Sequence, residues 1–434
     1  MKLCVQGLWH LGSVTAACLA SLGHEVTGLD FDTEIVNKLK QGRPPLFEPG
    51  LEDLINNGIL SGKLVFSSAT EESVRNVDVL WVCYDTPIDD NDNADVGYVI
   101  AQVEKTLSYL PVGATVLLSS QMPVCTIKHL EKVSKINFAE KQLGFAYSPE
   151  NLRLGKALEV FLKPDRIIAG VRSNRDRERL DRLFRTITDR IEWMSVESAE
   201  MTKHAINAFL AVSVTFANEI ASICELVGAD AREVERGLKS EARIGPKAYL
   251  SPGSAFAGGT LSRDIVFLNK VSSEKHMETP LLSSVNASND KHKDWVKRKL
   301  TTLFPNLSTI TVAIWGLTYK PGTDTLRRSM AVELCNWLIE HGVKVKVHDP
   351  VVNKLPETWV DNVERCSDPI ETIVTANVLV LCTEWPQYRE IASSQIVVSS
   401  QNLIVIDANR FLSTLATKPG VTYIAVGTPD NLEV

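Results

Sequence analysis

Short apolar runs alternate with amphipathic, helix-like stretches over the first part of the chain. The runs have the length and the β-branched or aromatic composition of buried strands: KLCVQG (2–7), HEVTGLD (24–30), VDVLWVCYD (77–85), GATVLLSS (113–120), LGFAYSP (143–149) and DRIIAG (165–170). Strands that alternate with helices in this order predict a parallel sheet covered by helices on both faces.

The same pattern starts again near residue 311. TVAIWG (311–316) is followed by the helix-like SMAVELCNWLIEHG (329–342) and by VKVKVHDP (343–350), which repeats the order of strand, helix, strand and acidic tip. Further strands are predicted for NVLVLCTEW (377–385) and LIVIDANRF (403–411). We therefore expect a second Rossmann-like unit near the end of the chain.

The segment between these units has a different character. Residues 196–304 contain no convincing strand, and ESAEMTKHAINAFLAVSVTFANEIASICELVGA (197–229) predicts a helix of about 30 residues that could serve as a spine or a dimer seam. The predicted fold is α/β, with two Rossmann-like doubly wound domains (1–195 and 305–434) joined by a central helical dimerisation region (196–304).

Composition narrows the possible functions. The 46 basic and 53 acidic side chains give a net charge of −7, and no Lys/Arg stretch is dense enough for nucleic acid, so we expect no nucleic-acid partner. The 8 cysteines are scattered without metal-ligand spacing, which predicts no metal site and a reducing compartment. No leader segment and no run of about 18 apolar residues stands out, so we expect a soluble, cytoplasmic protein without a membrane partner.

Residues 7–12 read GLWHLG, between the first predicted strand and a helix-like stretch. In a dinucleotide-binding turn the first glycine allows the tight turn, the second lets the backbone approach the pyrophosphate, and the third lets the helix pack on the strand. Gly7 and Gly12 fit the first and third roles, whereas Trp9 stands in place of the second glycine. Asp30 follows the second strand at about the spacing, roughly 20 residues, of a carboxylate that binds ribose hydroxyls.

This loop allows two interpretations. It is either a dinucleotide site, which favours NAD over NADP because no arginine comes immediately after Asp30, or an ordinary strand-to-helix turn over which Trp9 packs. The loop alone supports both interpretations about equally.

A series of motifs, in order and in spacing, resembles the UDP-glucose/GDP-mannose dehydrogenase family. The motifs are EPGL (48–51), DTP (85–87), SSQMPVCT (119–126), YSPENLRLGKA (147–157), PDRIIAG (164–170), AEMTKHAINAF (199–209), FANEIA (216–221), ARIG (242–245), PGSAFAGGTLSRD (252–264), GLTYKPGTDTLRRS (316–329), TEW (383–385) and DANR (407–410). Several motifs in the right order are far more specific than one glycine-rich loop. The resemblance implies an N-terminal NAD-binding domain, a central dimerisation region and a C-terminal domain that holds the nucleotide of a nucleotide-sugar.

Members of this family oxidise the C6 hydroxyl of the sugar to a carboxylate, with two NAD and a covalent cysteine intermediate. By resemblance, the catalytic positions are Glu150, Lys203, Asn207, Thr260 and Asp264. The implied cofactor contacts are Gly7, Trp9, His10, Leu11, Gly12, Asp30, Thr86, Pro87, Ser120, Gln121, Leu154, Arg263 and Arg327. The implied substrate contacts are Glu150, Asn151, Leu152, Arg153, Lys203, Asn207, Arg243, Tyr249, Ala257, Lys320 and Arg410.

The chemistry of these residue types agrees with several of the implied roles. Lys203 and Asn207 lie four positions apart on one face of the long helix, among apolar neighbours where a polar pair must find partners or a ligand. In the family the matching pair holds the substrate oxygen and a water; the alternative is a solvated helix face. Glu150 follows the fifth strand, where doubly wound sheets bind ligands, and matches a glutamate that acts on water; the alternative is a surface-loop glutamate.

Other matching positions concern the helix ends and the phosphates. Asp264 matches an aspartate near the reacting oxygen and Arg263 a lysine near the cofactor, although either could cap or pair on a helix that starts nearby. Arg243 matches an arginine that reaches into the neighbouring subunit's sugar site, which implies a homodimer. Lys320 and Arg410 match positions on the nucleotide-sugar, and guanidinium groups suit phosphates because they bind them bidentately.

The sequence also departs from the family at positions that matter for chemistry. The STVP threonine is Gln121, the second acid of PEFLxE is Leu154, TDDxRESP reads TDTLRRSM (323–330), and the GGSCLPKD loop reads GGTLSRD. Thr260 therefore stands where the family has its nucleophilic cysteine. A threonine hydroxyl is barely ionised at neutral pH and needs a dedicated base, whereas a thiol is partly ionised.

Three functions remain open on the sequence. They are an oxidation of the sugar C6 hydroxyl without a thioester, a two-electron oxidation of a nucleotide-sugar to an aldehyde or ketone, and a silent protein that binds the nucleotide-sugar or NAD. Retention of Glu150, Lys203, Asn207 and Asp264 favours an enzyme. We expect NAD as the cofactor, a nucleotide-sugar as the substrate and a homodimer.

Overall fold

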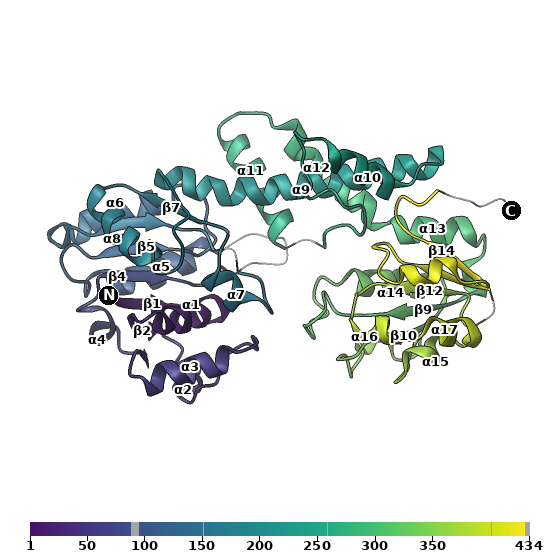
Figure 1. The fold of residues 1–434 in the computed structure, drawn as a ribbon, viewed down its shortest axis with the longest axis horizontal. Coiled ribbons are helices and arrows are strands. Elements are labelled where there is room, and N and C mark those ends of the chain that lie inside the picture. Colours follow the sequence, from purple (N-terminus) through teal and green to yellow (C-terminus); the bar gives the residue numbers. More distant parts are fainter. Residues whose placement is uncertain (88–94, 151, 258, 401, 430–434) are drawn as a thin grey trace. The chain divides into compact units, whose positions relative to one another are not determined.

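The computed structural model describes residues 1–87, 95–150, 152–257, 259–400 and 402–429. They form two compact units, Met1–Ile206 and Asn207–Val434 (Figure 1). The division into three domains at 195/196 and 304/305 stays a prediction.

The first unit is built on an eight-stranded sheet in the order β3-β2-β1-β4-β5-β6-β7-β8. Its strands are β1 (Lys2–Gln6), β2 (Glu25–Leu29), β3 (Leu64–Ser67), β4 (Val79–Val82), β5 (Thr115–Leu118), β6 (Gly144–Tyr147), β7 (Ile167–Val171) and β8 (Ile191–Met194). Every apolar run predicted before residue 195 overlaps one of these strands, but the two short edge strands, β3 and β8, were not predicted.

Two strands, β7 and β8, run in the direction opposite to the rest of the predicted parallel sheet. β7 pairs antiparallel with β6, with Tyr147 opposite Gly170, while the other neighbouring strands are parallel. A parallel pair needs a crossover that returns the chain to the opposite end of the sheet. The helix between these strands, α7 (Ala157–Leu162), has only 6 residues. The chain therefore enters β7 at the end of the sheet where it left β6.

Helices cover both faces of this sheet. They are α1 (His10–Ser21), α2 (Thr33–Lys40), α3 (Leu51–Leu60), α4 (Thr70–Val74), α5 (Val96–Leu107), α6 (Thr126–Asn137), α7 and α8 (Asn174–Phe184). Leu3 and Val5 of β1 belong to a core with α1, α3, α7 and α8, whereas Cys4 between them belongs to a core with α4, α5 and α6. This alternation follows from the two-residue period of a strand.

The long predicted helix is α9 (Val196–Val227), with 32 residues. It is the one helix of the described residues that is long and apolar enough to cross a membrane, and 39% of its most apolar window is buried. Polar residues interrupt this helix, so its sequence contains no uninterrupted apolar run of membrane-spanning length. Glu200 and His204 of this helix are buried and form hydrogen bonds with the loop after β5.

The second unit carries the repeated α/β pattern. Its sheet has the order β11-β10-β9-β12-β13-β14, and all of its strand pairs are parallel. The strands are β9 (Thr311–Trp315), β10 (Lys344–His348), β11 (Val363–Arg365), β12 (Val378–Leu381), β13 (Leu403–Ile406) and β14 (Val421–Ile424). The predicted restart of the pattern near residue 311 is therefore confirmed.

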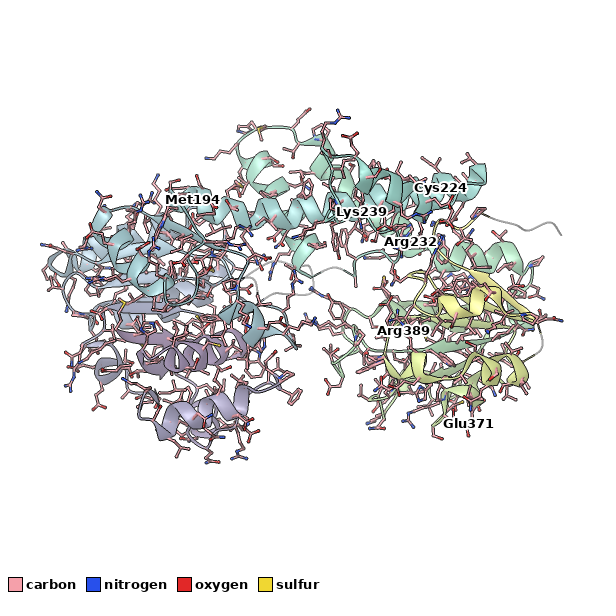
Figure 2. All side chains as sticks on the ribbon, in the orientation of Figure 1. Met194, Cys224, Arg232, Lys239, Glu371 and Arg389 are labelled. Atoms are coloured by element: carbon pink, nitrogen blue, oxygen red, sulfur yellow. The ribbon has the colours of Figure 1, made fainter. Side chains whose placement is uncertain are left out.

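Helices precede and surround this second sheet. They are α10 (Ala231–Ser240), α11 (Thr260–Glu274), α12 (Pro280–Lys293), α13 (Trp295–Leu303), α14 (Met330–Glu340), α15 (Pro369–Ile373), α16 (Gln387–Glu390) and α17 (Ser393–Ser399). Among the described residues of 207–304 there is no strand. Figure 2 shows the side chains on these elements, including Arg232 and Lys239 of α10, which both pair with Glu235.

Candidate functional site

The turn between β1 and α1 requires glycine at two places. Gly7 has a φ of +89°, and a Cβ on it would lie 2.8 Å from the Tyr84 ring. A Cβ on Gly12 would lie 1.6 Å from the carbonyl oxygen of Gly7, so no other residue fits where α1 crosses the turn. This cradle of backbone before a helix start is the shape that a dinucleotide pyrophosphate needs.

Trp9 occupies the place of the missing glycine without backbone strain. Its φ of −69° and ψ of −151° are ordinary for a residue with a side chain, and the residue is 45% exposed at the start of α1. A residue with a side chain therefore fits this backbone, and the indole of Trp9 is partly open to solvent at the start of α1.

The neighbouring His10 ties this turn to a distant segment. Its Nε2–H donates to the carboxylate of Glu48 over 3.1 Å. The same carboxylate accepts hydrogen bonds of 2.8 Å from the backbone N–H groups of Gly155 and Ala157, before α7. Leu154 lies half-buried next to that contact. Glu48, in the EPGL motif, was not among the predicted site residues; its burial is set by tertiary contacts.

Asp30 lies at the carboxyl end of β2 and is 8% exposed. Its carboxylate accepts hydrogen bonds from the backbone N–H of Leu8, over 2.6 Å, and of Asp32, over 2.9 Å. A carboxylate has about four acceptor positions, so it can also accept from ribose hydroxyls. The arrangement fits the adenosine end of NAD, and a 2′-phosphate would instead meet a negative charge.

The ends of β4 and β5 bring further predicted cofactor residues together. The hydroxyl of Thr86 donates to the carbonyl oxygen of Gln121 over 2.7 Å. Pro87 follows Thr86, and Ser120 precedes Gln121 with a buried hydroxyl that has no hydrogen-bond partner among the described residues. Both loops lie at the carboxyl edge of the sheet, where doubly wound folds bind their ligands.

Glu150 and Lys203 meet in the same unit although they are 53 positions apart. The Nζ of Lys203 in α9 donates to the carbonyl oxygen of Glu150 over 2.6 Å and lies 3.5 Å from its carboxylate. That carboxylate also accepts a 2.8 Å hydrogen bond from the backbone N–H of Leu152. Lys203 is only 8% exposed, so its ammonium group is largely shielded from water. Arg153 is exposed nearby in sequence, and Asn151 lies outside the described residues.

The same turn of α9 holds the loop that follows β5. The buried carboxylate of Glu200 accepts hydrogen bonds from the backbone N–H of Cys125, over 2.7 Å, and of Ile127, over 3.0 Å. Nε2 of His204 donates to the carbonyl oxygen of Met122 over 3.0 Å. Burial raises the pKa of Glu200, although the two N–H donors offset part of this effect. Sequence reasoning missed both residues, and only their polar type inside an apolar helix could have marked them.

In the second unit, Asn207 and Asp264 are paired. The side-chain amide of Asn207 donates to the carboxylate of Asp264, which is 1% exposed near the start of α11. Thr260 is the first residue of α11 and is exposed, and Arg263 is half-buried. The turn before Thr260 has a φ of +72° at Gly259.

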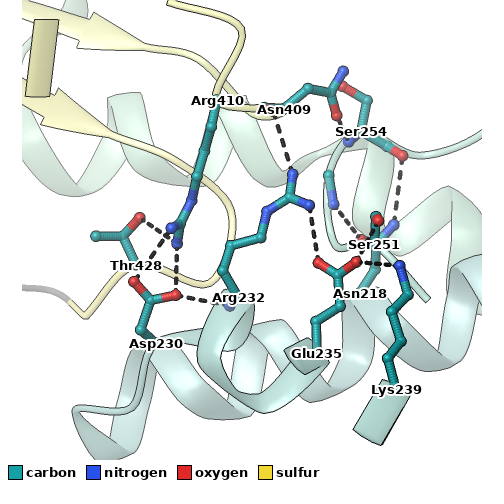
Figure 3. A network of polar contacts seen from close by, with 11 residues as sticks. Asn218, Asp230, Arg232, Glu235, Lys239, Ser251, Ser254, Asn409, Arg410 and Thr428 are labelled. Carbon is teal, nitrogen blue, oxygen red and sulfur yellow. Dashed lines mark hydrogen bonds and ion pairs between the residues drawn. The ribbon is translucent and has the colours of Figure 1, made fainter. Parts of the chain in front are cut away.

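The segment that leads into this turn is held by side-chain amides. The N–H groups of Gly253 and Ser254 donate to the side-chain oxygens of Asn218 and Asn409, over 2.9 Å and 2.7 Å (Figure 3). Nε2 of His292 donates to the carbonyl oxygen of Gly253 over 2.8 Å. Ala257 lies half-buried further along this segment. None of these amide residues was among the predicted site residues.

Arg410 follows β13 and binds a carboxylate of its own unit. Its guanidinium donates to both carboxylate oxygens of Asp230, over 3.2 Å and 3.0 Å, and to the hydroxyl of Thr428 over 3.3 Å (Figure 3). Asp230 caps the start of α10 by accepting from the N–H of Arg232. The role of Arg410 on a nucleotide-sugar stays a prediction.

The remaining predicted contacts are surface residues of the second unit. Lys320 and Arg327 are exposed in the loop after β9, Tyr249 is 59% exposed, and Arg243 pairs with Glu241 over 2.9 Å at the surface. Their proposed contacts with a ligand or a neighbouring subunit stay predictions.

Family models match the chain over most of its length and in order. The NAD binding domain of the UDP-glucose/GDP-mannose dehydrogenase family matches residues 1–188, the central domain matches 197–291 and the UDP binding domain matches 313–414.

Similar proteins span the whole chain. The UDP-glucose 6-dehydrogenase of Pseudomonas aeruginosa is 32% identical over 444 residues, covering 99% of this chain and 98% of that protein. The UDP-glucose 6-dehydrogenase of Rhizobium meliloti is 31% identical over 438 residues, covering 99% of this chain and 100% of that protein. The structure of a UDP-glucose dehydrogenase from Pyrobaculum islandicum has a TM-score of 0.85 at 29% identity and covers 99% of this chain and 98% of that one.

Proposed function

Since the chain belongs to the UDP-glucose/GDP-mannose dehydrogenase family and is an NAD-dependent oxidoreductase of the nucleotide-sugar dehydrogenase type, we propose that it oxidises the C6 hydroxyl of a UDP- or GDP-linked hexose without a thioester intermediate. UDP-glucose is the first substrate to test, because the similar proteins are UDP-glucose 6-dehydrogenases. The family resemblance of the UDP binding domain supports a UDP-sugar further.

The contact between Lys203 and Glu150 carries this proposal. It places an ammonium group, with up to three donors, beside a carboxylate in a largely buried position. NAD, when bound, accepts one hydride in each oxidation. Lys203 stabilises the negative charge that develops on the C6 oxygen, with Asn207 as a second donor. The hydroxyl proton leaves to water, and the first product is the aldehyde.

The second oxidation then uses water in place of a nucleophilic side chain. Glu150 acts as the base that positions a water for addition to the aldehyde, which forms the hydrate. The hydrate then loses a hydride and a proton to give the 6-carboxylic acid, which releases a second proton to water and becomes the 6-carboxylate. Thr260 contributes no covalent bond, because its hydroxyl lacks a base in the neighbouring sequence other than Asp264, and that carboxylate is already paired with Asn207. A silent binding protein is not favoured, because a protein that only binds would not need this set of polar side chains.

Product analysis with a matched variant tests the proposal. The full chain is incubated with NAD and a panel of UDP- and GDP-hexoses, and both the NADH formed and the mass of the sugar product are measured. We expect turnover of one nucleotide-sugar, with no acyl-enzyme after acid quenching. Thr260→Cys, which introduces the thiol at the same position, should give a trapped acyl-enzyme. An acyl-enzyme in the unaltered protein would refute the hydrate route, and no NADH with any sugar would refute the enzyme function.

We also propose that the protein is soluble and cytoplasmic and that its domains are residues 1–195, 196–304 and 305–434. It forms a homodimer through α9. Phe209, Phe216 and Ile223 recur every seven residues on one helix face and are 68%, 44% and 54% exposed. Arg243 then reaches the sugar site of the partner.

Phe216→Asp should yield monomers in light scattering, whereas Leu60→Asp, at an exposed position of α3, should not. A wild-type monomer that turns over would refute the dimer.

A further inference from the structure

A guanidinium and a phenol converge on the turn that precedes Thr260. A Cβ built on Gly259 would lie 3.7 Å from the hydroxyl of Tyr319 and 3.8 Å from NH1 of Arg328. Because Gly259 has no side chain, it does not fill the space next to these two groups. Thr260 is exposed and Tyr319 is 37% exposed, so the place is open to a ligand. All four residues belong to the second unit.

Two departures from the family meet at this place. Thr260 stands where the family has its nucleophilic cysteine, and Arg328 stands where TDDxRESP has its glutamate. They are 68 positions apart in the sequence and adjacent in the fold. The substitution at 328 replaces a negative charge by a positive one beside the position at which the family forms a bond to C6.

The backbone at Arg328 is also unusual. Its φ is +61°, in the left-handed region that few residues other than glycine adopt. Strained positions of this kind cluster at functional sites. The side chain that this backbone presents reaches the Gly259 turn.

We propose that Arg328 and Tyr319 form a subsite that binds the C6 carboxylate of the oxidised nucleotide-sugar. The inference rests on the proposed function, because it takes Thr260 as the position nearest to C6. A guanidinium binds a carboxylate bidentately, and a phenol adds a third donor. Without a cation at position 328, the product carboxylate would meet the negative charge of the buried Asp264. The glutamate that the family has at this position would add a second negative charge. With Thr260 in place of the cysteine, the oxidised sugar cannot stay bound as a thioester. The subsite holds its carboxylate in place instead.

Binding measurements without turnover test this subsite. Calorimetry compares UDP-glucose with UDP-glucuronate, its 6-carboxylate, on the full chain without NAD. Arg328→Glu should weaken binding of the carboxylate by about tenfold or more, because a hydrogen-bonded ion pair is lost, and should change binding of UDP-glucose little. Tyr319→Phe should also weaken binding of UDP-glucuronate but not of UDP-glucose, and by a smaller factor than Arg328→Glu.

Matched variants separate this effect from damage to the fold. Arg236→Glu makes the same charge change at an exposed position of α10 and should leave both affinities unchanged. Arg328→Lys keeps the charge but loses the bidentate geometry, so it should give an intermediate loss and serves if Arg328→Glu does not fold. Equal weakening of both ligands, or weakening of neither, overturns the subsite. If the unaltered protein binds neither UDP-glucuronate nor any UDP- or GDP-hexose of the panel, the proposed function fails as well. If it binds a nucleotide-hexose other than UDP-glucose, the same comparison is made between that nucleotide-hexose and its 6-carboxylate.

Discussion

The side-chain amide of Asn207 donates a hydrogen bond to the carboxylate of Asp264, and both groups are buried. The pair joins α9 to the start of α11, the helix whose first residue is Thr260. Loss of this amide would take one hydrogen-bond donor away from a buried carboxylate. The pair therefore contributes to stability as well as to the proposed chemistry.

Asn207→Ala should lower the free energy of unfolding by about 1–3 kcal/mol, since it leaves the buried Asp264 carboxylate without this donor. Urea unfolding followed by circular dichroism measures the change. Asn57→Ala removes an amide from an exposed position of α3 and serves as the control. An equal loss of stability in both variants would contradict a stabilising role for the hydrogen bond between Asn207 and Asp264.

Glu200→Gln should raise the KM for NAD more than it lowers kcat. A glutamine offers one acceptor oxygen in place of two, so one of the N–H groups of Cys125 and Ile127 loses its partner and the loop after β5 loosens. Steady-state kinetics with varied NAD measures the effect. Glu197→Gln, one turn earlier on α9 at a half-buried carboxylate that pairs with Arg172, should leave both constants unaltered. If kcat alone falls, Glu200 does not act through the cofactor loop.

The buried Glu200 also predicts a pH dependence of stability. Burial raises its pKa in the folded protein, so the folded state binds its proton more tightly than the unfolded state does. The contribution of Glu200 to stability is therefore largest below the ordinary glutamate pKa of about 4.3 and decreases as the pH rises through the raised pKa.

Unfolding of the wild type and of Glu200→Gln across this pH range measures the contribution of Glu200. The stability difference between the two proteins, wild type minus variant, should fall with rising pH and then level off. A difference that grows with pH would mean that the two N–H donors outweigh burial.

Trp9→Gly should tighten NAD binding, because the exposed indole no longer occupies the space above the turn. The cost in stability should stay within a few tenths of a kcal/mol to about 1 kcal/mol, because glycine is accepted at the start of a helix. Calorimetry with NAD and NADP measures both affinities. NADP should bind more weakly to both proteins, since Asp30 lies where its 2′-phosphate would be. Equal affinity for NADP and NAD would remove the assignment of Asp30.

The sequence alone predicted the order of the elements and the glycine turn. These features are local: strand and helix periods appear within a few residues, and the backbone path through Gly7 and Gly12 leaves no room for a Cβ. The second Rossmann-like unit was predicted for the same reason. The edge strands β3 and β8 were missed because each has only 4 residues, which are too few to show the period of a strand clearly.

Only the tertiary structure decided which distant groups meet. The hydrophobic pattern does not show that the side chains of Glu48, Glu200 and Asn409 hold backbone groups of other segments. It does not set the antiparallel direction of β7, the ion pair of Arg410 with Asp230 or the position of Arg328 beside Gly259. Such contacts depend on how packed elements bring together residues far apart in the chain, because a polar group that burial removes from water must find whatever partner the fold places within reach.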